Sequence, residues 1–159
     1  MVIVACPNKE IGRRGFNPIA FVIHRTAGNY FGSREWILNP ISQVSYHFMI
    51  AETGMSEQFV DTKDTAWHAG KVVDSTWPLL NNSTNPNTYT IGIAISGIID
   101  TKPTIEQIAK CANIIKQWAK FYNIPIDSEH IIPHNTIRID KNCPGKYIDI
   151  GTIIYLSSL

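Results

Sequence analysis

Three side chains of this sequence carry donor atoms that suit zinc, and they come from distant segments. They are His24, which ends a short apolar run, His134, and Cys143, which precedes a Pro-Gly pair. A catalytic zinc site takes three protein ligands and leaves its fourth position to water. His134 and Cys143 are nine positions apart, too far for one helical turn, so a loop would have to bring them together.

The same residues also have an ordinary structural interpretation. Buried histidines can satisfy both ring nitrogens by hydrogen bonds, and a lone cysteine is often packed as a small apolar side chain. The three cysteines, Cys6, Cys111 and Cys143, fit neither a disulfide framework nor a paired CxxC zinc motif. We expect Cys111 to be a buried apolar residue, and the spacing alone leaves both interpretations of the other donors open.

The elements that would position these donors can be predicted from the apolar pattern. The run Ala20 to His24 predicts a buried strand with His24 at its carboxyl end, and Tyr89 to Ser96 predicts a central strand. Apolar residues recur every three or four positions from Thr104 to Tyr122, which predicts a helix whose apolar face packs on the sheet. Thr104 and Gln107 form a capping box for that helix.

Weaker signals complete the predicted fold. Ser33 could cap a short helix from Arg34 to Leu38 that Pro40 stops, and Ser45 to Ala51 with Glu57 to Val60 predicts a hairpin. Tyr46, Phe48 and Ile50 would then share one face of the first hairpin strand, with His47 and Met49 on the other. A long polar loop would run from Trp67 to about Thr88, and loops between short pieces would fill Ile131 to Leu159. Strands interspersed with helices favour an α/β (α+β) fold around one mixed sheet.

Composition bounds the function classes. The 159 residues are 44% apolar and 17% charged with a net charge of +1, which favours one compact domain over residues 1–159 and argues against disorder. No stripe of Lys or Arg could follow a phosphate backbone, so we expect no nucleic acid partner. Apolar stretches are far shorter than the roughly 20 residues of a membrane span, so we expect no membrane partner. The first ten residues do not resemble a signal peptide.

Several motifs, in order along the chain, resemble the type 2 N-acetylmuramoyl-L-alanine amidases. That family includes phage T7 lysozyme, the AmpD-like enzymes and the peptidoglycan recognition proteins. The matching segments are Phe21-Val22-Ile23-His24-Arg25-Thr26-Ala27-Gly28, Ser45-Tyr46-His47-Phe48-Met49-Ile50, Thr65-Ala66-Trp67-His68-Ala69-Gly70, Thr90-Ile91-Gly92-Ile93-Ala94-Ile95, Pro133-His134-Asn135 and Lys141-Asn142-Cys143-Pro144-Gly145.

The resemblance implies a zinc-dependent amidase that cuts peptidoglycan between N-acetylmuramic acid and L-alanine. His24, His134 and Cys143 correspond to the ligands of one zinc ion, in the branch that uses cysteine as the third ligand. Tyr46 corresponds to the catalytic tyrosine, and Lys141 to a lysine beside the metal that would stabilise negative charge on the carbonyl oxygen. The implied fold is a mixed sheet, six-stranded or smaller, flanked by helices, with the zinc in a groove on one face.

Other residues of the motifs have weaker assignments. Trp67 and His68 would line the substrate groove, although a loop tryptophan equally often covers the edge of a core. Tyr46 could instead be a core residue and Lys141 a surface charge, while His47 and His130 are interpreted as structural or surface residues. The sequence departs from many relatives at Arg25, where they carry a second histidine, and at Ala94, where some carry an acidic residue as general base.

The resemblance leaves a second function class open, a non-catalytic peptidoglycan-binding module of the same fold. Retention of all three donors disfavours it, because recognition alone does not require a thiolate. Inhibition of an RNA polymerase, a further property of T7 lysozyme, has no support in the sequence. We expect a phage endolysin or bacterial autolysin catalytic domain, made in the cytoplasm and acting on the cell wall. Because endolysins are often modular, a wall-binding domain could follow Leu159.

Overall fold

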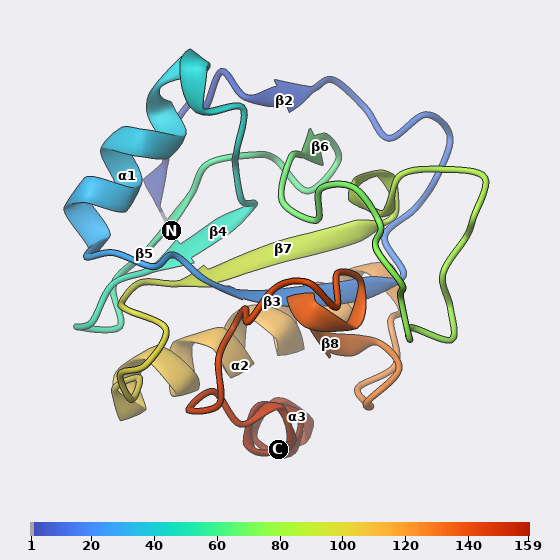
Figure 1. Cartoon of the computed structure of the whole chain (residues 1–159). Helices are drawn as coiled ribbons and strands as arrows, with labels where there is room; N and C mark the ends of the chain where they lie inside the picture. Colours follow the sequence, from blue (N-terminus) through green and yellow to red (C-terminus); the bar gives the residue numbers. More distant parts are fainter. Residues whose placement is uncertain (1) are drawn as a thin grey trace.

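A mixed six-stranded β-sheet forms the centre of the molecule (Figure 1), in the strand order β1-β5-β4-β7-β3-β8. The computed structural model describes residues 2–159. The strands of this sheet are β1 (Val2–Ile3), β3 (Ala20–Arg25), β4 (Phe48–Ile50), β5 (Ser56–Gln58), β7 (Thr90–Ile95) and β8 (Ile131–Pro133). A two-stranded antiparallel ribbon pairs β2 (Lys9–Glu10) with β6 (Thr65–Ala66). The helices are α1 (Tyr30–Leu38), α2 (Ile105–Tyr122) and α3 (Ile150–Ser158), with short 3-10 turns at Pro40–Ser42, Pro86–Thr88 and His134–Thr136.

The two predicted apolar strands lie side by side in the middle of this sheet. β3 and β7 run parallel in register from the Ala20–Thr90 pair to the Arg25–Ile95 pair, and every residue of both strands is buried. Strands covered on both faces are apolar throughout rather than alternating. This explains why both strands, each of which has a neighbouring strand on either side, are continuous apolar runs in the sequence.

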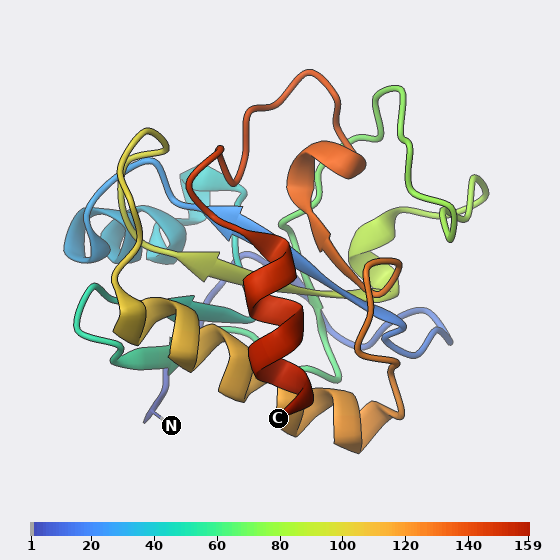
Figure 2. The same cartoon turned by 90° about the horizontal axis from the view of Figure 1, so that it is seen from below.

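Helices α2 and α3 cover one face of the sheet (Figure 2). Thr104 and Gln107 form the predicted capping box at the start of α2, and the fully buried Cys111 is one of the helix residues that face the sheet. Alternate residues of the strands point into this layer, because successive strand side chains face opposite sides. The main apolar cluster joins Phe21, Ile23, Phe48, Ile50, Ile91, Ile93, Ile95 and Ile131 of the strands to Cys111, Ile114, Ile115, Ala119 and Ile153 of the helices.

The opposite face of the sheet is covered by α1 and by the long segment 67–88. Met49 and Ala94 pack with Tyr30 and Ile37 of α1. Further along, Ala20, Val22, Ala69, Trp77, Tyr89, Ile132 and Ile137 form a third apolar cluster under the long segment. His24 has the same parity in β3 as Ala20 and Val22, so its side chain emerges on this second face. No helix among residues 2–159 has the length and apolar character that crossing a bilayer requires.

The start of α1 differs from the prediction. The helix begins at Tyr30 rather than Arg34, and its N-cap is Asn29, whose side chain accepts from the Gly32 backbone N–H at 2.8 Å. Ser33 therefore lies within the helix and does not cap it. Asparagine is an equally good N-cap, and the periodic signal of this short helix is too weak to locate its first turn.

The predicted orientation of Tyr46 was also wrong. β4 begins at Phe48, so Tyr46 precedes the strand, and it packs with the cluster that contains Met49 rather than with Phe48 and Ile50. The alternation rule holds only within a continuous strand. The hairpin itself is confirmed by the antiparallel pairing of β4 with β5, although both strands are shorter than expected.

Helix α3 was not predicted. Its residues were expected to be loop, yet Asp149 caps a helix whose buried Ile153 joins the main apolar cluster on the α2 side. The helix contacts α2 and β8, so its stability comes from tertiary packing, which a local pattern of nine residues does not reveal.

Candidate metal centre

The carboxyl end of β3 presents His24 on the sheet face opposite α2. Its backbone pairs with Ala94 of β7, and its ring is almost fully buried. The Ala94 side chain packs in the apolar cluster with Met49, so the acidic group that some relatives place in this strand has no counterpart here. The strand fixes the His24 backbone within the rigid centre of the sheet.

His134 and Cys143 approach the His24 ring from the chain that follows β8. His134 opens the 3-10 turn after β8, and its ring centroid lies 4.4 Å from that of His24. The Cys143 Sγ lies 3.8 Å from His24 Nδ1 and accepts the Arg25 backbone N–H at 3.3 Å. One donor atom from each of His24, His134 and Cys143 lies within 4.8 Å of the others, the one potential metal-binding group found among residues 2–159.

This donor set has the chemistry and the spacing of a zinc site. Two imidazole nitrogens and one sulfur are typical zinc ligands, and tetrahedral geometry would separate a nitrogen and a sulfur by about 3.6 Å. The observed 3.8 Å between Cys143 Sγ and His24 Nδ1 requires almost no rearrangement. The three donors predicted from sequence are therefore brought together in a constellation that fits the ion.

Burial keeps the donors of this cluster uncharged. It lowers the pKa of His24 well below the ordinary value, with a further contribution from the neighbouring His134. The pKa of His134 is lowered in the same way. Burial raises the pKa of the Cys143 thiol to about 11. Neutral imidazole is the form that binds a metal, whereas the thiol has to lose its proton.

The cluster lies at the bottom of a cavity of about 740 Å³. Tyr46, Trp67 and Lys141, predicted as site residues, all belong to its wall. Two smaller hollows of about 460 and 180 Å³ adjoin it, one sharing Val44 and Tyr46 and the other Trp67, Asn85 and Asn87. The full lining is His24, Arg25, Gln43, Val44, Tyr46, Trp67, His68, Gly70, Lys71, Asn85, Asn87, His134, Arg138, Lys141 and Cys143. The donors thus line a cavity that has two smaller hollows beside it.

Tyr46 and Lys141 reach the cavity from different sides. The half-buried Tyr46 ring lies 5.2 Å from the His24 ring between centroids, and burial raises the pKa of its phenol. In the part of the chain that the structure describes, no protein group hydrogen-bonds its hydroxyl. Lys141 is exposed on the loop that leads to Cys143. Both side chains are therefore available to a bound molecule.

His68 is among the residues that line the cavity, and its ring also contacts His24. Its Nδ1 is 3.1 Å from His24 Nε2, and the ring is only 6% exposed. The carbonyl oxygen of the next residue, Ala69, lies 3.0 Å from His134 Nε2. Each histidine of the cluster therefore has a partner on its outer nitrogen, which orients the ring. The role of the Ala69 carbonyl could not be predicted from the sequence, because every residue has a backbone oxygen.

Arg25, His47 and His130 do not contribute donors to the cluster. The Arg25 guanidinium donates to the carbonyl oxygens of Ile98 and Thr101. The positively charged side chain that follows His24 is therefore held by these loop carbonyls. His130 pairs with Asp127 at 2.6 Å. His47 is fully buried, and its structural role was predicted.

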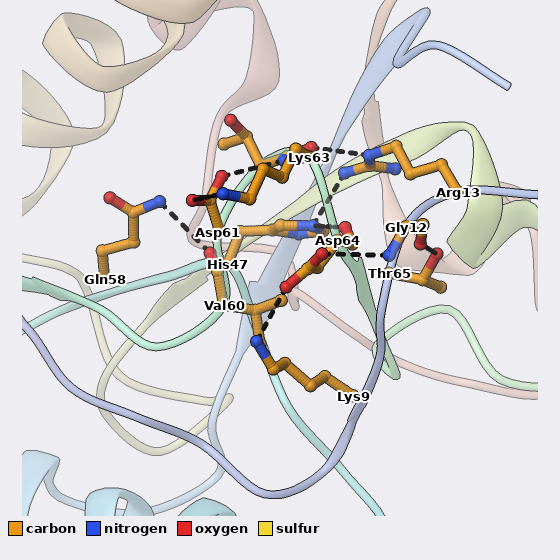
Figure 3. Close-up of polar contacts among 11 residues, drawn as sticks. Lys9, Gly12, Arg13, His47, Gln58, Val60, Asp61, Lys63, Asp64 and Thr65 are labelled. Atoms are coloured by element: carbon orange, nitrogen blue, oxygen red, sulfur yellow. Dashed lines mark hydrogen bonds and ion pairs between the residues drawn. The ribbon is translucent and has the colours of Figure 1, made fainter. Parts of the chain in front are cut away.

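Arg13, which was not predicted to have a role, connects several loops near the site through hydrogen bonds. Its Nη2 lies 2.8 Å from His47 Nε2, a contact that is drawn in Figure 3. The guanidinium also donates to the carbonyl oxygens of Thr62 and Thr90. Nearby, Asp64 accepts from the Gly12 backbone N–H at 2.9 Å and pairs with Lys9 at 2.7 Å. These contacts fasten the segment 9–13 to the segments that follow β5 and precede β7.

The sequence of this chain matches a model of a known protein family. The model described as N-acetylmuramoyl-L-alanine amidase matches residues 15–146, which include all three donors. N-acetylmuramoyl-L-alanine amidase A of Achromobacter lyticus is 37% identical over 79 residues, which are 49% of this chain. The chain spans only 37% of that relative's length.

Solved structures share the fold. A selenomethionine derivative of AmpD superposes with a TM-score of 0.79 at 21% identity, covering 98% of this chain and 93% of that one. The amidase AmiD from E. coli, solved with the substrate anhydro-N-acetylmuramic acid-L-Ala-D-γ-Glu-L-Lys, superposes with a TM-score of 0.75 at 21% identity. That match covers 96% of this chain and 58% of AmiD.

Proposed function

Because this chain belongs to the N-acetylmuramoyl-L-alanine amidase family, we propose that it hydrolyses peptidoglycan at the amide bond between N-acetylmuramic acid and L-alanine. We propose that one zinc ion, held by His24, His134 and Cys143, is required. The observation that supports this most directly is the approach of these three donors to within 4.8 Å at the bottom of the groove.

Zinc, when bound, polarises a carbonyl oxygen and makes water a nucleophile near neutral pH. The protein's own part is to bind the substrate and to stabilise the charge that develops on the carbonyl oxygen. Lys141 is suited to this task, since it lies two residues before Cys143 and belongs to the lining of the same cavity. A cation at the point where negative charge appears stabilises the transition state more than the ground state.

Tyr46 is proposed to act in proton transfer. Its hydroxyl stays protonated at neutral pH, because burial raises its pKa, so it enters the reaction as a hydrogen-bond donor. From the wall of the cavity it would orient the attacking water and pass a proton towards the leaving L-alanine nitrogen. No carboxylate is available for this step at Ala94, which gives the phenol more weight here than in relatives with an acidic residue.

The extended groove supports a substrate with two arms. The cavity of about 740 Å³ shares Tyr46 with one neighbouring hollow and Trp67 with another. The scissile bond joins a sugar to a peptide, so both arms must lie along the protein when the bond is over the donors. We propose that Trp67 provides apolar contact surface for one arm.

We propose that this activity serves cell-wall lysis, as in an endolysin or autolysin, with the chain made in the cytoplasm and acting on the bacterial cell wall. Mass spectrometry of muropeptides released from several wall types tests both the bond cut and the preferred stem peptide. Cleavage at a sugar-sugar or peptide-peptide bond would contradict the proposal.

The competing function is a non-catalytic peptidoglycan-binding module. The complete donor set favours the enzyme, because recognition of the wall needs neither a thiol nor two bare imidazole nitrogens. Zinc content per chain and digestion of purified peptidoglycan separate the two. New L-alanine amino termini without new reducing sugar ends support the amidase, whereas binding without release supports the module.

Replacement of one ligand supplies the matched control. We expect Cys143→Ser to lose tight zinc binding and amidase activity while it keeps a cooperative unfolding transition, because Cys143 lies on a loop outside the apolar clusters. Cys111→Ala, which changes a thiol inside the α2 packing, should keep one zinc per chain and its activity. Full turnover by Cys143→Ser would remove Cys143 from the site.

A further inference from the structure

The two residues His68 and Ala69 lie directly behind the two histidine donors. The His68 side chain contacts His24 Nε2 at 3.1 Å, and the Ala69 carbonyl oxygen contacts His134 Nε2 at 3.0 Å. In His24 the contacted nitrogen is the one opposite Nδ1, which faces Cys143 Sγ. What these contacts do depends on which atom of each pair carries the proton, and the surrounding hydrogen bonds decide that.

The direction of the bond between His68 and His24 is set at Thr90. The Thr90 hydroxyl lies 2.7 Å from the Pro86 carbonyl oxygen, which can only accept, so the hydroxyl proton points there. Towards His68 Nε2, at 3.2 Å, the Thr90 oxygen is therefore an acceptor, and Nε2 carries the proton. A neutral His68 then has a bare Nδ1, which accepts from His24 Nε2–H.

The consequence reaches the donor atom itself. With its proton on Nε2, a neutral His24 has a free lone pair on Nδ1, the nitrogen that faces Cys143 Sγ at 3.8 Å. The Ala69 carbonyl has the same effect on His134, because a carbonyl oxygen accepts only, so His134 Nε2 must donate and its Nδ1 is bare. Both rings present the nitrogen that a metal requires.

These proton positions hold when the rings of His24, His68 and His134 are neutral, and their surroundings favour the neutral form. In the described chain, no hydrogen bond or ion pair joins a carboxylate to His24, His68 or His134. The guanidinium of Arg13 lies beside His47 (Figure 3). The His47 ring is in turn 5.7 Å from the His68 ring between centroids. The nearby cation and the absence of a carboxylate partner in the described chain both disfavour an additional proton on His68.

Two features keep His68 and Ala69 in place. Gly92 of β7 leaves the space for the ring, because a Cβ there would lie 2.4 Å from His68 Cγ. The Asn87 side-chain oxygen accepts the backbone N–H groups of both His68, at 3.1 Å, and Ala69, at 2.7 Å. Arg13 in turn donates to the Asn87 and Thr90 carbonyl oxygens at 3.3 and 3.1 Å. The segment is anchored independently of any metal.

We propose that His68 is a positioning residue that, through the chain His24–His68–Thr90–Pro86, fixes the proton of His24 on Nε2, as the Ala69 carbonyl does for His134. The donors are thereby arranged before metal arrives. This inference rests on the proposed metal function for its purpose, but the proton positions belong to the metal-free protein and can be measured there.

Nitrogen-15 NMR of the histidine rings tests the proton positions directly. In metal-free protein, long-range proton–nitrogen spectra should show His24, His68 and His134 each protonated on Nε2 and bare on Nδ1, with assignments from single His→Gln variants. Adding zinc should shift Nδ1 of His24 and of His134 and leave His68 in the same form. Protonation of His24 on Nδ1 in the metal-free protein would overturn the proposal.

A matched pair of variants tests the role of His68 in metal binding. His68→Asn retains an acceptor close to the position of Nδ1, whereas His68→Leu fills the space without one. Loss of an outer partner of a metal-bound histidine typically weakens affinity about 10- to 100-fold. We expect a loss of that size for His68→Leu in competition with a zinc chelator, and a smaller one for His68→Asn.

Thr90→Val keeps the test decisive if His68→Leu is poorly folded. It removes the hydroxyl that holds His68 Nε2–H but preserves side-chain volume, so His68 should show a mixture of ring forms and zinc affinity should fall. Equal affinity and an unchanged His24 ring in both Thr90→Val and His68→Leu would overturn the proposal. Fixed ring protons without zinc binding in the unmodified protein would instead contradict the proposed function alone.

Discussion

The side chain of Tyr46 makes two separate contributions to the groove. Its ring packs beside His24 and the cluster that contains Met49, while its hydroxyl reaches the cavity without a protein partner among the described residues. A substitution that removes only the hydroxyl separates these contributions, because the ring and its packing remain.

We expect Tyr46→Phe to bind one zinc ion per chain and to unfold at nearly the same denaturant concentration, yet to hydrolyse peptidoglycan roughly 10²-fold more slowly or worse. The loss should appear in kcat, since proton transfer occurs after binding. Steady-state kinetics on a defined muropeptide provide the measurement. An unchanged kcat would mean that Tyr46 is a packing residue.

In the proposed zinc site, the Cys143 thiol should make the affinity for the metal depend on pH. Burial raises its pKa to about 11, so below that pH the free thiol carries a proton that binding must release. The pKa values of His24 and His134 lie below the ordinary 6.5, so these rings release none above pH 7. Apparent affinity should therefore rise about tenfold per pH unit from pH 7 to 9.

Chelator competition at pH 7, 8 and 9 measures this slope. Cys143→Ser is the control, with a weaker affinity that hardly depends on pH, since a serine hydroxyl does not ionise in this range. An affinity of the unmodified protein that stays constant across these pH values would show that no thiol proton is released on binding.

The donors could be predicted at the residue scale because zinc chemistry is restricted to a few side-chain types. His24, His134 and Cys143 were identified by type, by motif and by their order along the chain. The partners behind them could not be, since the Ala69 contact uses a backbone oxygen and the Thr90 contact depends on a hydroxyl whose acceptor lies at Pro86. Such roles arise only from the folded geometry.

At the scale of elements, strand β7 has a different task on each face. Its isoleucines pack under α2, whereas on the other face Thr90 and Gly92 lie against the His68 ring and Ala94 packs in the cluster with Met49. Gly92 is the point where the His68 ring lies against the strand, and a Cβ there would meet the ring at 2.4 Å. The absence of a side chain at Gly92 is thus needed to leave room for the His68 ring, and the sheet itself does not need it.

We expect Gly92→Ala to destabilise the protein by about 1–3 kcal/mol, as overpacking in a core does, and to weaken zinc affinity because His68 is displaced. Urea denaturation and chelator competition measure the two effects. The double variant Gly92→Ala/His68→Ala, in which the ring is gone, should show less than the sum of the two single losses. Strict additivity would mean that Gly92 and His68 do not interact.

Elements with a strong local pattern were predicted, and elements defined by distant contacts were not. β3, β7 and α2 follow from apolar periodicity and a capping box. α3 was missed because its packing partners lie in α2 and β8, and the β2–β6 ribbon because Lys9 and Ala66 are paired across more than fifty residues of chain. Short elements carry little signal of their own.

At the scale of the whole molecule, four buried histidines link stability to acidity. Burial lowers the pKa of His24, His47, His68 and His134, to about 3 for His68. In the unfolded chain they titrate near pH 6.5. Below that pH the unfolded chain takes up protons that the folded protein does not, so the free energy of unfolding must fall as pH decreases towards the folded pKa values.

For the metal-free protein we expect this loss to begin below pH 6.5, with up to about 1.4 kcal/mol per pH unit for each histidine that stays neutral. Urea denaturation at pH 7.0, 6.0 and 5.5 measures it. His68→Asn removes one titrating group and should show a shallower dependence. Equal stability at all three pH values would mean that the rings already carry protons in the folded state.

The separation of 119 positions between His24 and Cys143 has a consequence for how the site comes into existence. A growing chain acquires the central strands early, but the sulfur emerges only after β8 and its following turn. Until then the chain has at most two of the three metal donors, even if the sheet has formed. The full set of three donors therefore exists only once the segment that follows β8 has been synthesised and has folded against β3.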